Sequence, residues 1–263
     1  MKQRELISEL DSLLNPKLFQ DYCPNGLLVD ATGDPEHEIA KVVTGVSLRQ
    51  QLIDRAIDEG AGAIIVHHPN GFWNSEKDKR VIGVHGSYLR SLIKHGISLF
   101  GYHLPLDANT IVGNNMIIAT ELGLAPRYPA EPARFMDGIG VICPEAPVTG
   151  DMLSRVFPNG YGAFNFVDGK EYRVAICSGS GTSGMEEAHK LGCNMFITGE
   201  IRESTPIFAE EHGMAVVYAG HHRTEVFGVR ELAKYLSNRY PVAKYLSNRY
   251  PVEAKFIDID NPI

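Results

Sequence analysis

The stretch KVVTGVSLRQQLIDRAIDEGAGAIIVHHPNGFW, residues 41–73, contains a complete strand, helix and strand. KVVTGV is a β-branched run that ends at a turn, which is typical of a strand. In the segment that follows, Leu52, Ile53 and Ala56 fall on one face of a helix. AIIVHH then predicts the next strand, and a strand–helix–strand order of this kind favours an α/β fold with a largely parallel sheet.

The same alternation continues along the chain. Further strands are expected at residues 98–103, 173–178, 194–200, 214–222 and 254–260, and helices at residues 1–14, 88–96, 113–122, 183–192, 203–213 and 220–232. Residues 125–138, APRYPAEPARFMDG, are rich in proline and are expected to form a linker or surface loop. We therefore expect a first α/β domain over residues 1–126 and a second over residues 127–263.

One segment of the second domain is duplicated. AKYLSNRYPV at residues 233–242 recurs without change at residues 243–252. Pro241 should interrupt any continuous helix through the two copies, because proline removes a helical hydrogen bond. The duplication follows every residue to which we assign a functional role below, so it does not change their numbers.

Composition excludes several classes of protein. The 263 residues carry a formal net charge of 25 − 32 = −7 without a cluster of five basic residues, so there is no strong nucleic-acid signal. No apolar run reaches membrane-spanning length, and the amphipathic N-terminus is unlike a signal peptide. The four cysteines are scattered without a CxxC pair, which fits reduced thiols in a cytoplasmic protein.

Several polar side chains stand where predicted strands finish. His67 and His68 end one strand, His103 ends the next, and Glu200 and His221 end two strands of the second half. Ligands of open α/β sheets bind beyond the carboxyl ends of the strands, so these residues are expected to gather around a ligand. Adjacent imidazoles at the end of a buried strand favour a metal ion.

Two acids complete this set. The segment YHLPLDA contributes Asp107, and Pro105 argues against a regular helix there. His221 and Glu225 lie one helical turn apart, so both can bind one ion, or the carboxylate can bridge two. Zn, Mn, Fe and Co all accept imidazole and carboxylate ligands, and a bound metal would activate water as a nucleophile near neutral pH.

The glycine turn GSGTSG, residues 179–184, gives a competing interpretation. It matches GxGxxG between a predicted strand and helix, and Glu200 follows at about the spacing of the dinucleotide fingerprint, which would make the protein an NAD(P)-binding oxidoreductase. Any tight strand-to-helix turn also favours Gly and Ser, and the backbone N–H groups of such a turn could hold a substrate phosphate. The turn has no lysine, which argues against a P-loop NTPase.

Together these segments show a resemblance. DYCPNGLLVD, IIVHHPNGFW, YHLPLDA followed by GNN, FITGE, AGHHRTE and FIDIDNP resemble, in order and over nearly the whole chain, the GTP cyclohydrolase 1 type 2 homologues, an NGG-interacting-factor-like family of dinuclear metal proteins. The resemblance implies two interlinked α/β domains of similar topology with mostly parallel sheets and a metal site in the cleft between them. It further implies a toroidal homohexamer.

The resemblance also implies a ligand set and an activity. Two divalent ions, Zn, Mn or Fe, would be held by five residues, of which Glu225 would be the bridge: His67, His68, Asp107, His221 and Glu225. The expected function is a metal-dependent hydrolase acting on a nucleotide or a related phosphorylated heterocycle, with His103 or Glu200 as the catalytic base. The alternative is a non-catalytic, metal-binding regulatory or interaction protein.

Overall fold

The computed structural model describes residues 1–77, 80–126, 131–239 and 252–262. The chain divides into two compact units, each with its own mixed α/β core. The first unit comprises Met1–Val112 and Val229–Ile259, and the second comprises Gly113–Gly228 and Asp260–Ile263. The expected α/β fold class with two domains is confirmed.

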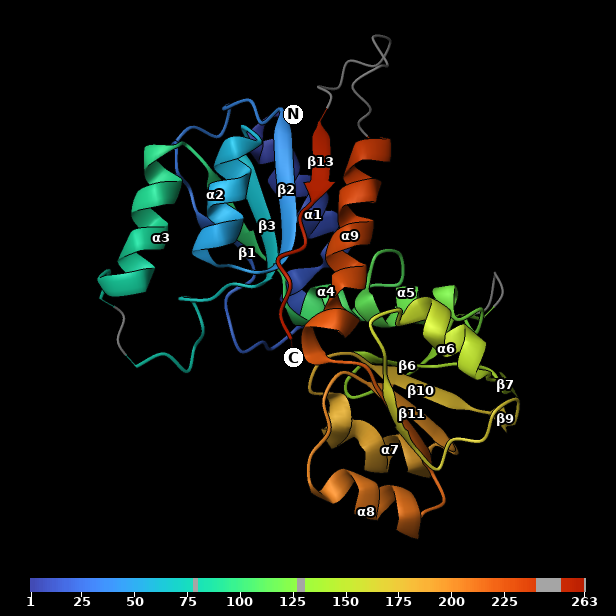
Figure 1. Cartoon of the computed structure of the whole chain (residues 1–263). Helices are drawn as coiled ribbons and strands as arrows, with labels where there is room; N and C mark the ends of the chain where they lie inside the picture. The colour runs from blue at the N-terminus through green and yellow to red at the C-terminus, as the bar shows by residue number, and fades with distance from the viewer. Residues whose placement is uncertain (78–79, 127–130, 240–251, 263) are drawn as a thin grey trace. The chain divides into compact units, whose positions relative to one another are not determined.

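The first unit is built on a five-stranded sheet (Figure 1). Its strands, in sheet order, are β1 (Gly26–Val29), β4 (Ser98–Gly101), β3 (Ala63–His68), β2 (Lys41–Ser47) and β13 (Glu253–Phe256). All neighbours are parallel except β1, which is antiparallel to β4. The central strands are buried along almost their whole length, because helices cover both faces of a parallel sheet.

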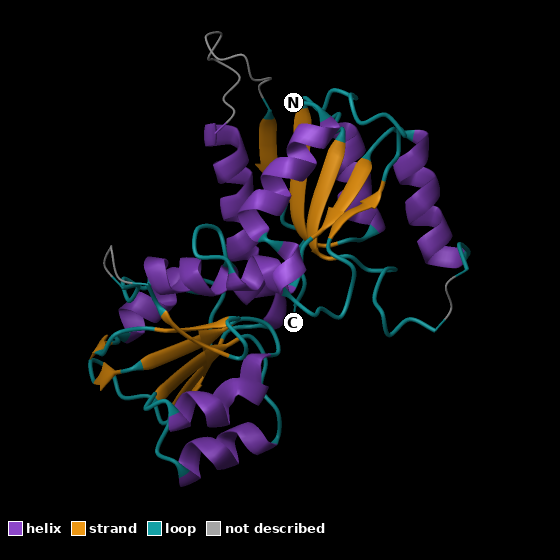
Figure 2. Cartoon of the chain, turned by 180° about the vertical axis from the view of Figure 1, so that it is seen from behind, coloured by secondary structure: helices purple, strands orange, loops and turns teal. Residues whose placement is uncertain are grey.

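The helices of the first unit lie on both faces of its sheet (Figures 1 and 2). They are α1 (Gln3–Leu14), α2 (Gln50–Asp58), α3 (Gly83–Lys94), the short α4 (Leu104–Ala108) and most of α9 (His221–Arg239), with a 3-10 turn η1 (Pro16–Leu18) after α1. The apolar face of α2, with Leu52 and Ile53, packs on Val43 and Ile64 in one core cluster. The helix predicted within residues 41–73 therefore covers the two strands that flank it in sequence, β2 and β3.

The second unit contains a six-stranded sheet. Its strands, in sheet order, are β5 (Ala133–Phe135), β6 (Gly140–Ile142), β10 (Val174–Cys177), β11 (Met195–Thr198), β12 (Ala215–Tyr218) and β8 (Gly162–Phe164). The three central strands β10, β11 and β12 are parallel, and the outer strands pair antiparallel. A separate two-stranded sheet joins β7 (Ala146–Pro147) to β9 (Glu171–Tyr172).

Alternate residues of the central strands pack on opposite helix layers, as the period of two in a strand requires. Ile176 and Ile197 belong to the core that includes α5 (Asn114–Glu121) and α6 (Gly150–Val156). Ala175 and Phe196 belong to the core that includes α7 (Met185–Lys190) and α8 (Ser204–Glu211). A 3-10 turn, η2 (Gly181–Gly184), connects β10 to α7 and contains the glycine-rich motif.

The units interleave along the sequence, which differs from the single boundary at residues 126/127 that the composition suggests. Strand β13 pairs in parallel with β2, and Thr44 donates a 2.8 Å hydrogen bond to the carbonyl of Val229 in α9. Both interactions tie the C-terminal segment to the first sheet, and no change in composition marks them. The segment expected to be a linker contains strand β5. Residues 127–130 of that segment, Pro241 and most of the second AKYLSNRYPV copy lie outside the described residues.

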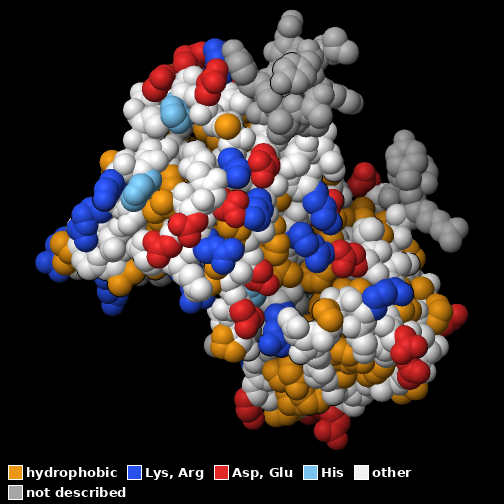
Figure 3. Space-filling view, turned by 45° about the horizontal axis from the view of Figure 1, so that its top comes forward, with side chains coloured by type: hydrophobic (Ala, Val, Ile, Leu, Met, Phe, Trp, Pro, Cys, Tyr) orange, Lys and Arg blue, Asp and Glu red, His pale blue; other side chains and the backbone are white. Residues whose placement is uncertain are grey.

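Charge is mixed on the surface that Figure 3 draws, where acidic and basic side chains are interspersed. Such a pattern gives no single-sign field of the kind that attracts nucleic acid. In the part of the chain that the structure describes, no helix combines the length and the apolar character that crossing a membrane requires.

Candidate metal centre

The first group of candidate ligands begins where β3 ends. His67 is fully buried and His68 is partly exposed, and their ring centroids lie 4.6 Å apart. Adjacent residues of a regular strand point to opposite faces, but β3 ends at His68 and Pro69 follows. The end of the strand therefore brings both imidazoles to one place, as the pair at the strand end predicted.

His103 and Asp107 join this group from the neighbouring strand. After β4, His103 precedes the short helix α4, and Asp107 lies in its first turn with Oδ2 at 3.6 Å from Nε2 of His67. The expectation that Pro105 would prevent a helix here is wrong. Proline is tolerated in the first helical turn, where its missing N–H has no intrahelical partner to lose.

The three imidazoles of the first unit form a cluster that can hold an ion. Ring centroids lie 5.0 Å apart for His67 and His103 and 5.6 Å apart for His68 and His103. One ligand atom from each ring lies within 4.8 Å of the other two. The Trp73 ring packs edge-on against His103 at 5.2 Å, so the tryptophan forms part of the wall of this cluster.

Hydrogen bonds at Nδ1 orient each of these rings. Nδ1 of His67 lies 3.1 Å from the carbonyl oxygen of Tyr102, which can only accept, so this nitrogen carries the proton. Nδ1 of His68 lies 3.1 Å from Oγ of Ser47. For His67 this leaves Nε2 with the lone pair toward a metal, which is the arrangement that metal-binding histidines usually show. The hydroxyl of Ser47 can donate or accept, so it holds the ring of His68 in place without fixing which nitrogen carries the proton.

Asp21 performs the same role for His103 with a charged group. Its Oδ1 lies 2.6 Å from Nδ1 of His103, and its Oδ2 accepts from the Leu104 N–H and from Nδ2 of Asn25, both at 2.9 Å. Burial opposes the charged carboxylate, but these hydrogen bonds, led by that of His103, outweigh it and hold the pKa of Asp21 below its usual range. His103 is therefore fixed from a segment some eighty residues earlier.

The thiol of Cys23 lies near Asp21 and His103 but is a poor metal ligand. One ligand atom from each of the three residues lies within 4.8 Å of the others. Burial, assisted by the charge of Asp21, raises the pKa of Cys23 to about 12, so the thiolate that a metal needs is disfavoured. The donors that fit an ion in this unit are therefore imidazoles and a carboxylate.

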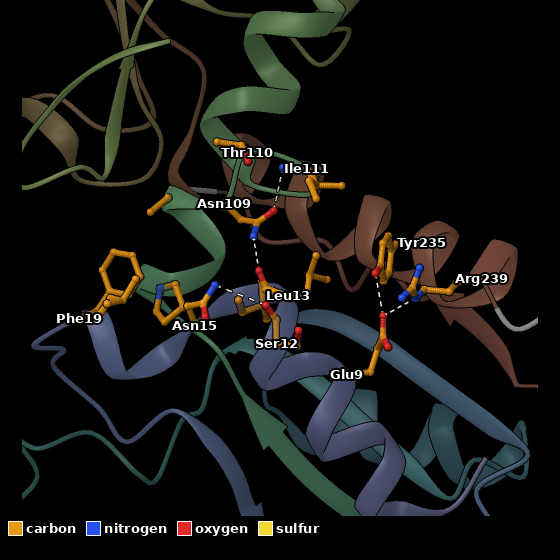
Figure 4. A pocket seen from close by; sticks show the side chains of 14 residues that line it. Glu9, Ser12, Leu13, Asn15, Phe19, Asn109, Thr110, Ile111, Tyr235 and Arg239 are labelled. Atoms are coloured by element: carbon orange, nitrogen blue, oxygen red, sulfur yellow. Dashed lines mark hydrogen bonds and ion pairs between the residues drawn. The ribbon is translucent and has the colours of Figure 1, made fainter. Parts of the chain in front are cut away.

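A cavity of about 490 Å³ lies beside α4 and is lined by residues of α1, α4, α9 and the loops that follow α1 and α4 (Figure 4). On one side Glu9 accepts hydrogen bonds from Tyr235 at 2.7 Å and from Arg239 at 2.6 Å. On the other side Asn109 donates to the carbonyl of Leu13 at 2.7 Å. This contact ties the end of α4 to α1, and so it supports the helix that places Asp107.

The second group of ligands lies in the second unit, at the start of α9. His221 and Glu225 face the same side one turn apart, with 3.1 Å between Nε2 and Oε1, as their spacing predicted. Glu225 is buried, whereas the side chain of His221 is 29% exposed. Glu200, which follows β11, has its Oε1 at 2.8 Å from Nδ1 of His221.

The electrostatics of His221 follow from these two acids. Burial disfavours the charged imidazolium, but hydrogen bonds and charge from Glu225 and then Glu200 outweigh it and raise the pKa of His221 to about 9. In the metal-free chain the ring therefore carries a proton at neutral pH. A cation bound at Nε2 would take the place of the proton that faces Glu225, while Nδ1 would keep its bond to Glu200.

The glycine turn packs against this second group. The Gly179 N–H donates to Oγ1 of Thr224 at 3.0 Å. A Cβ at Gly179 would lie only 2.3 Å from Oε1 of Glu225 and 3.1 Å from Nε2 of His221. At Gly181 and Gly184 a Cβ would collide with the side chains of neighbouring residues. All three glycines are thus in close contact with other parts of the protein, so the fold itself requires small residues at these positions.

Several residues that contact the candidate ligands could not be identified from the sequence. Ser47, Asp21 and Ser180 all contact a candidate ligand or its partner, and none stands out as a strand-end imidazole does. Asp21 lies in the DYCPNGLLVD segment, so the resemblance marked its surroundings without a role for the residue. The hydrogen bond of Tyr102 comes from its backbone, which no side-chain pattern can reveal.

Known proteins match this sequence over nearly its whole length. The model of the family Duf34/NIF3 (NGG1p interacting factor 3) matches residues 1–262. A Pseudomonas aeruginosa protein named GTP cyclohydrolase 1 type 2 homolog is 34% identical over 260 residues, which is 98% of this chain and 97% of that protein. An Escherichia coli K12 protein of the same name is 34% identical and is covered completely, as is this chain.

Solved structures show the same fold. The structure titled protein ybgI, unknown function, is 33% identical with a TM-score of 0.83, and both chains are fully covered. The structure of TTHA1606 from Thermus thermophilus is 30% identical with a TM-score of 0.79, covering 100% of this chain and 99% of that one.

Proposed function

Because the chain belongs to the Duf34/NIF3 (NGG1p interacting factor 3) family, and because it carries two groups of pre-oriented imidazoles and carboxylates, we propose that it is a dinuclear-metal-dependent hydrolase. The observation that carries this proposal is the hydrogen bonding at Nδ1 of His67, His68 and His221. At His67 and His221 the partner can only accept, so each bond leaves Nε2 as the ligand atom, and at His68 the Ser47 hydroxyl holds the ring in place.

The proposed ligands are those that the resemblance implied. His67, His68 and Asp107 come from the first group, and His221 and Glu225 come from the second. If Glu225 were shared by both ions, as the resemblance implies, this set would supply three protein ligands to each ion, the number typical of catalytic zinc sites, which keep a further position for water or substrate. The donors are nitrogen and oxygen alone, which suits Zn, Mn or Fe.

In this proposal the bound ions supply Lewis acidity and a water activated for attack near neutral pH. The chain keeps Nδ1 of His67 and His221 protonated through the carbonyl of Tyr102 and through Glu200, and it orients His68 through Ser47. His103, whose Nδ1 is hydrogen-bonded to Asp21, is positioned to move a proton at Nε2. Both carboxylate oxygens of Glu200 already have partners within the protein, so Glu200 is the weaker candidate for a base.

The proposed substrate is a nucleotide or a related phosphorylated heterocycle. Its support is the printed name of the relatives, GTP cyclohydrolase 1 type 2 homolog, together with a metal chemistry suited to hydrolysis. The mixed surface charge and the net charge of −7 favour a small substrate over a nucleic acid.

The deciding experiment is elemental analysis of the purified protein beside the variants His68→Ala and Glu225→Ala. We expect close to two transition-metal ions per chain in the wild type and a clear loss in both variants. The control is His95→Ala, because His95 is exposed and only bonds the carbonyl of Ser91 in its own helix. A wild type that stays metal-free after incubation with Zn, Mn and Fe would contradict the proposal.

Activity is tested next with the metal-loaded protein. We expect hydrolysis within a panel of nucleoside triphosphates and related phosphorylated heterocycles, and loss of turnover in His68→Ala. If the wild type holds two ions but turns over none of the panel, the non-catalytic metal-binding function replaces the hydrolase.

We further propose that the protein is a cytoplasmic homohexamer. The four cysteines are buried free thiols, which suits a reducing compartment. Exposed apolar side chains at the start of α3, Val81, Ile82 and Val84, offer a surface that self-association would cover. Light scattering should give a mass about six times the 29.0 kDa of the chain, and a monomer mass would contradict this assembly.

A further inference from the structure

We propose that Ser180 and Glu200 form a hydrogen-bonded relay that positions His221 as a metal ligand, and that the glycine turn serves to place this relay. The inference deepens the proposed function and rests on it, since it concerns the metal site to which His221 belongs. It gives the glycine motif a role in that site.

The relay is continuous from the turn to the ring. Oγ of Ser180 donates to Oε2 of Glu200 at 2.5 Å, and Oε1 of Glu200 lies 2.8 Å from Nδ1 of His221. A carboxylate can only accept, so the proton of this second bond resides on Nδ1 of the ring. Nε2, which faces Oε1 of Glu225 at 3.1 Å, is therefore the nitrogen presented to a cation.

The backbone fixes both ends of the relay to each other. Ser180 follows β10 and Glu200 follows β11, and these strands are parallel neighbours with Cys177 opposite Thr198. Beyond the strands, the carbonyl of Gly179 accepts from the N–H groups of Gly199 at 3.0 Å and Glu200 at 2.9 Å. The turn and the loop after β11 thus form one hydrogen-bonded platform beneath the first turn of α9.

Gly179 is the residue that allows this platform to approach the ligands. Its φ of +58° lies in the left-handed region, which glycine adopts at little cost and which strains most residues with a side chain, and a Cβ there would overlap Oε1 of Glu225. The Gly179 N–H donates to Thr224, which lies on α9 between the two ligands. The turn that contains Gly179 therefore contacts α9, Glu225 and Glu200.

This geometry makes Glu200 a positioning residue and not a catalytic one. The two oxygens of Glu200 are engaged by Ser180 and His221, so the carboxylate acts through the imidazole. Removing an orienting partner of this kind lowers metal affinity by about 10- to 100-fold in well-studied metal sites. We therefore expect removal of the Glu200 carboxylate to weaken zinc binding more than removal of the Ser180 hydroxyl.

The test measures zinc affinity by competition with a chromophoric chelator on the full-length protein. The variants are Glu200→Ala, Glu200→Gln, Ser180→Ala and Ser180→Thr. We expect Glu200→Ala to weaken zinc binding by about 10- to 100-fold and Ser180→Ala to weaken it less. Ser180→Thr, which keeps the hydroxyl, should restore the affinity. The controls are Ser183→Ala and Glu203→Gln, which are exposed residues of the same turn and of the loop after β11.

A second measurement reports the ring directly. In zinc-loaded protein with ¹⁵N-labelled histidine, the Nδ1–H proton of His221 should be protected from solvent in the wild type and lost to exchange in Glu200→Ala. Glu200→Gln keeps an acceptor oxygen without the charge, so it should retain the protected proton and lose only part of the affinity. Thermal unfolding of each variant shows whether the fold is intact.

The outcomes distinguish the relay from the metal site itself. If the wild type binds zinc and Glu200→Ala and Ser180→Ala bind it equally well with the same Nδ1–H signal, the relay is overturned and the proposed function stands. If the wild type binds none of Zn, Mn and Fe, the proposed function and the relay fall together, and if it binds Mn or Fe but not zinc, the same affinities are measured with that metal. If Glu200→Ala fails to fold, the contrast between Ser180→Ala and Ser180→Thr still decides, because equal affinities in that pair would overturn the relay.

Discussion

The candidate ligand group of the first unit is largely buried and is assembled from several elements, whereas the candidate group on α9 is partly exposed and lies within one helical turn. The side chain of His67 is 0% exposed and that of His221 is 29% exposed. The orienting partners differ as well: a carbonyl holds His67, and a carboxylate holds His221. Packing alone restricts the fully buried ring of His67, whereas the more exposed ring of His221 is held by the stronger, charged hydrogen bond.

Gly179→Ala, which alters the group on α9, is expected to have the largest effect on stability and metal content. The substitution imposes a positive φ on a residue with a Cβ and drives that Cβ into Glu225. Left-handed strain and overpacking together should lower the free energy of unfolding by about 2–5 kcal/mol. Glu225 can relieve the overlap only by moving away, so metal bound at His221 and Glu225 should be lost, as elemental analysis would show.

Gly192→Ala is the matched control for this variant. Gly192 also has a positive φ, +83°, but a Cβ there would meet nothing within 4 Å. It should cost only the backbone strain of about 1–2 kcal/mol and leave metal content unchanged. Equal metal loss in both variants would mean that general destabilisation, and not contact with the ligands, removes the metal.

In the first unit, His103 is the imidazole that a carboxylate orients, and Asp21→Asn tests the contribution of that charged hydrogen bond. Asp21 is almost fully buried and accepts hydrogen bonds from His103, Leu104 and Asn25. Loss of the charge should lower the free energy of unfolding by about 1.5–3 kcal/mol, the usual contribution of a hydrogen bond to a charged group. Denaturant unfolding monitored by circular dichroism measures the difference.

The effect of Asp21 should also depend on pH with a definite sign. Its folded pKa lies below the ordinary value of 3.8, so its contribution is present above that value and is lost as pH falls through the folded pKa. The gap between wild type and Asp21→Asn should thus be full at neutral pH and shrink in acid below about pH 4. Asp54→Asn, an exposed control in α2, should stay within about 0.5 kcal/mol of wild type. A gap that widens in acid would contradict this assignment.

The parts of the fold that follow local patterns could be predicted from the sequence. The strand and helix of residues 41–73 are where periodicity places them, because apolar spacing records which face is buried. The division of the chain could not be predicted in the same way. Strand β13 pairs with β2 across more than two hundred residues of sequence, and nothing in its local pattern names its partner.

The same contrast applies to the site. Imidazoles at the end of a buried strand are conspicuous, since a core has no use for them, and the spacing of His221 and Glu225 identifies one helical face. The orienting residues are inconspicuous because a serine or an aspartate in a loop is ordinary. Ser180 becomes meaningful only when the parallel pairing of β10 and β11 brings it beside Glu200.

Ser47→Ala gives the smallest expected effect and sharpens the comparison most directly. Ser47 is opposite His68 across the β2–β3 pair and offers a neutral hydroxyl to its Nδ1 at 3.1 Å, where Glu200 offers a carboxylate to His221 at 2.8 Å. We expect zinc affinity to fall by less than the roughly 10-fold lower limit for orienting partners, and to recover in Ser47→Thr. Ser87→Ala, which removes only a long 3.4 Å bond to Gln50, is the control and should change nothing. Ser47→Ala and Glu200→Ala could instead weaken zinc binding equally. The charge of the orienting residue would then not explain the difference between the two groups of candidate ligands.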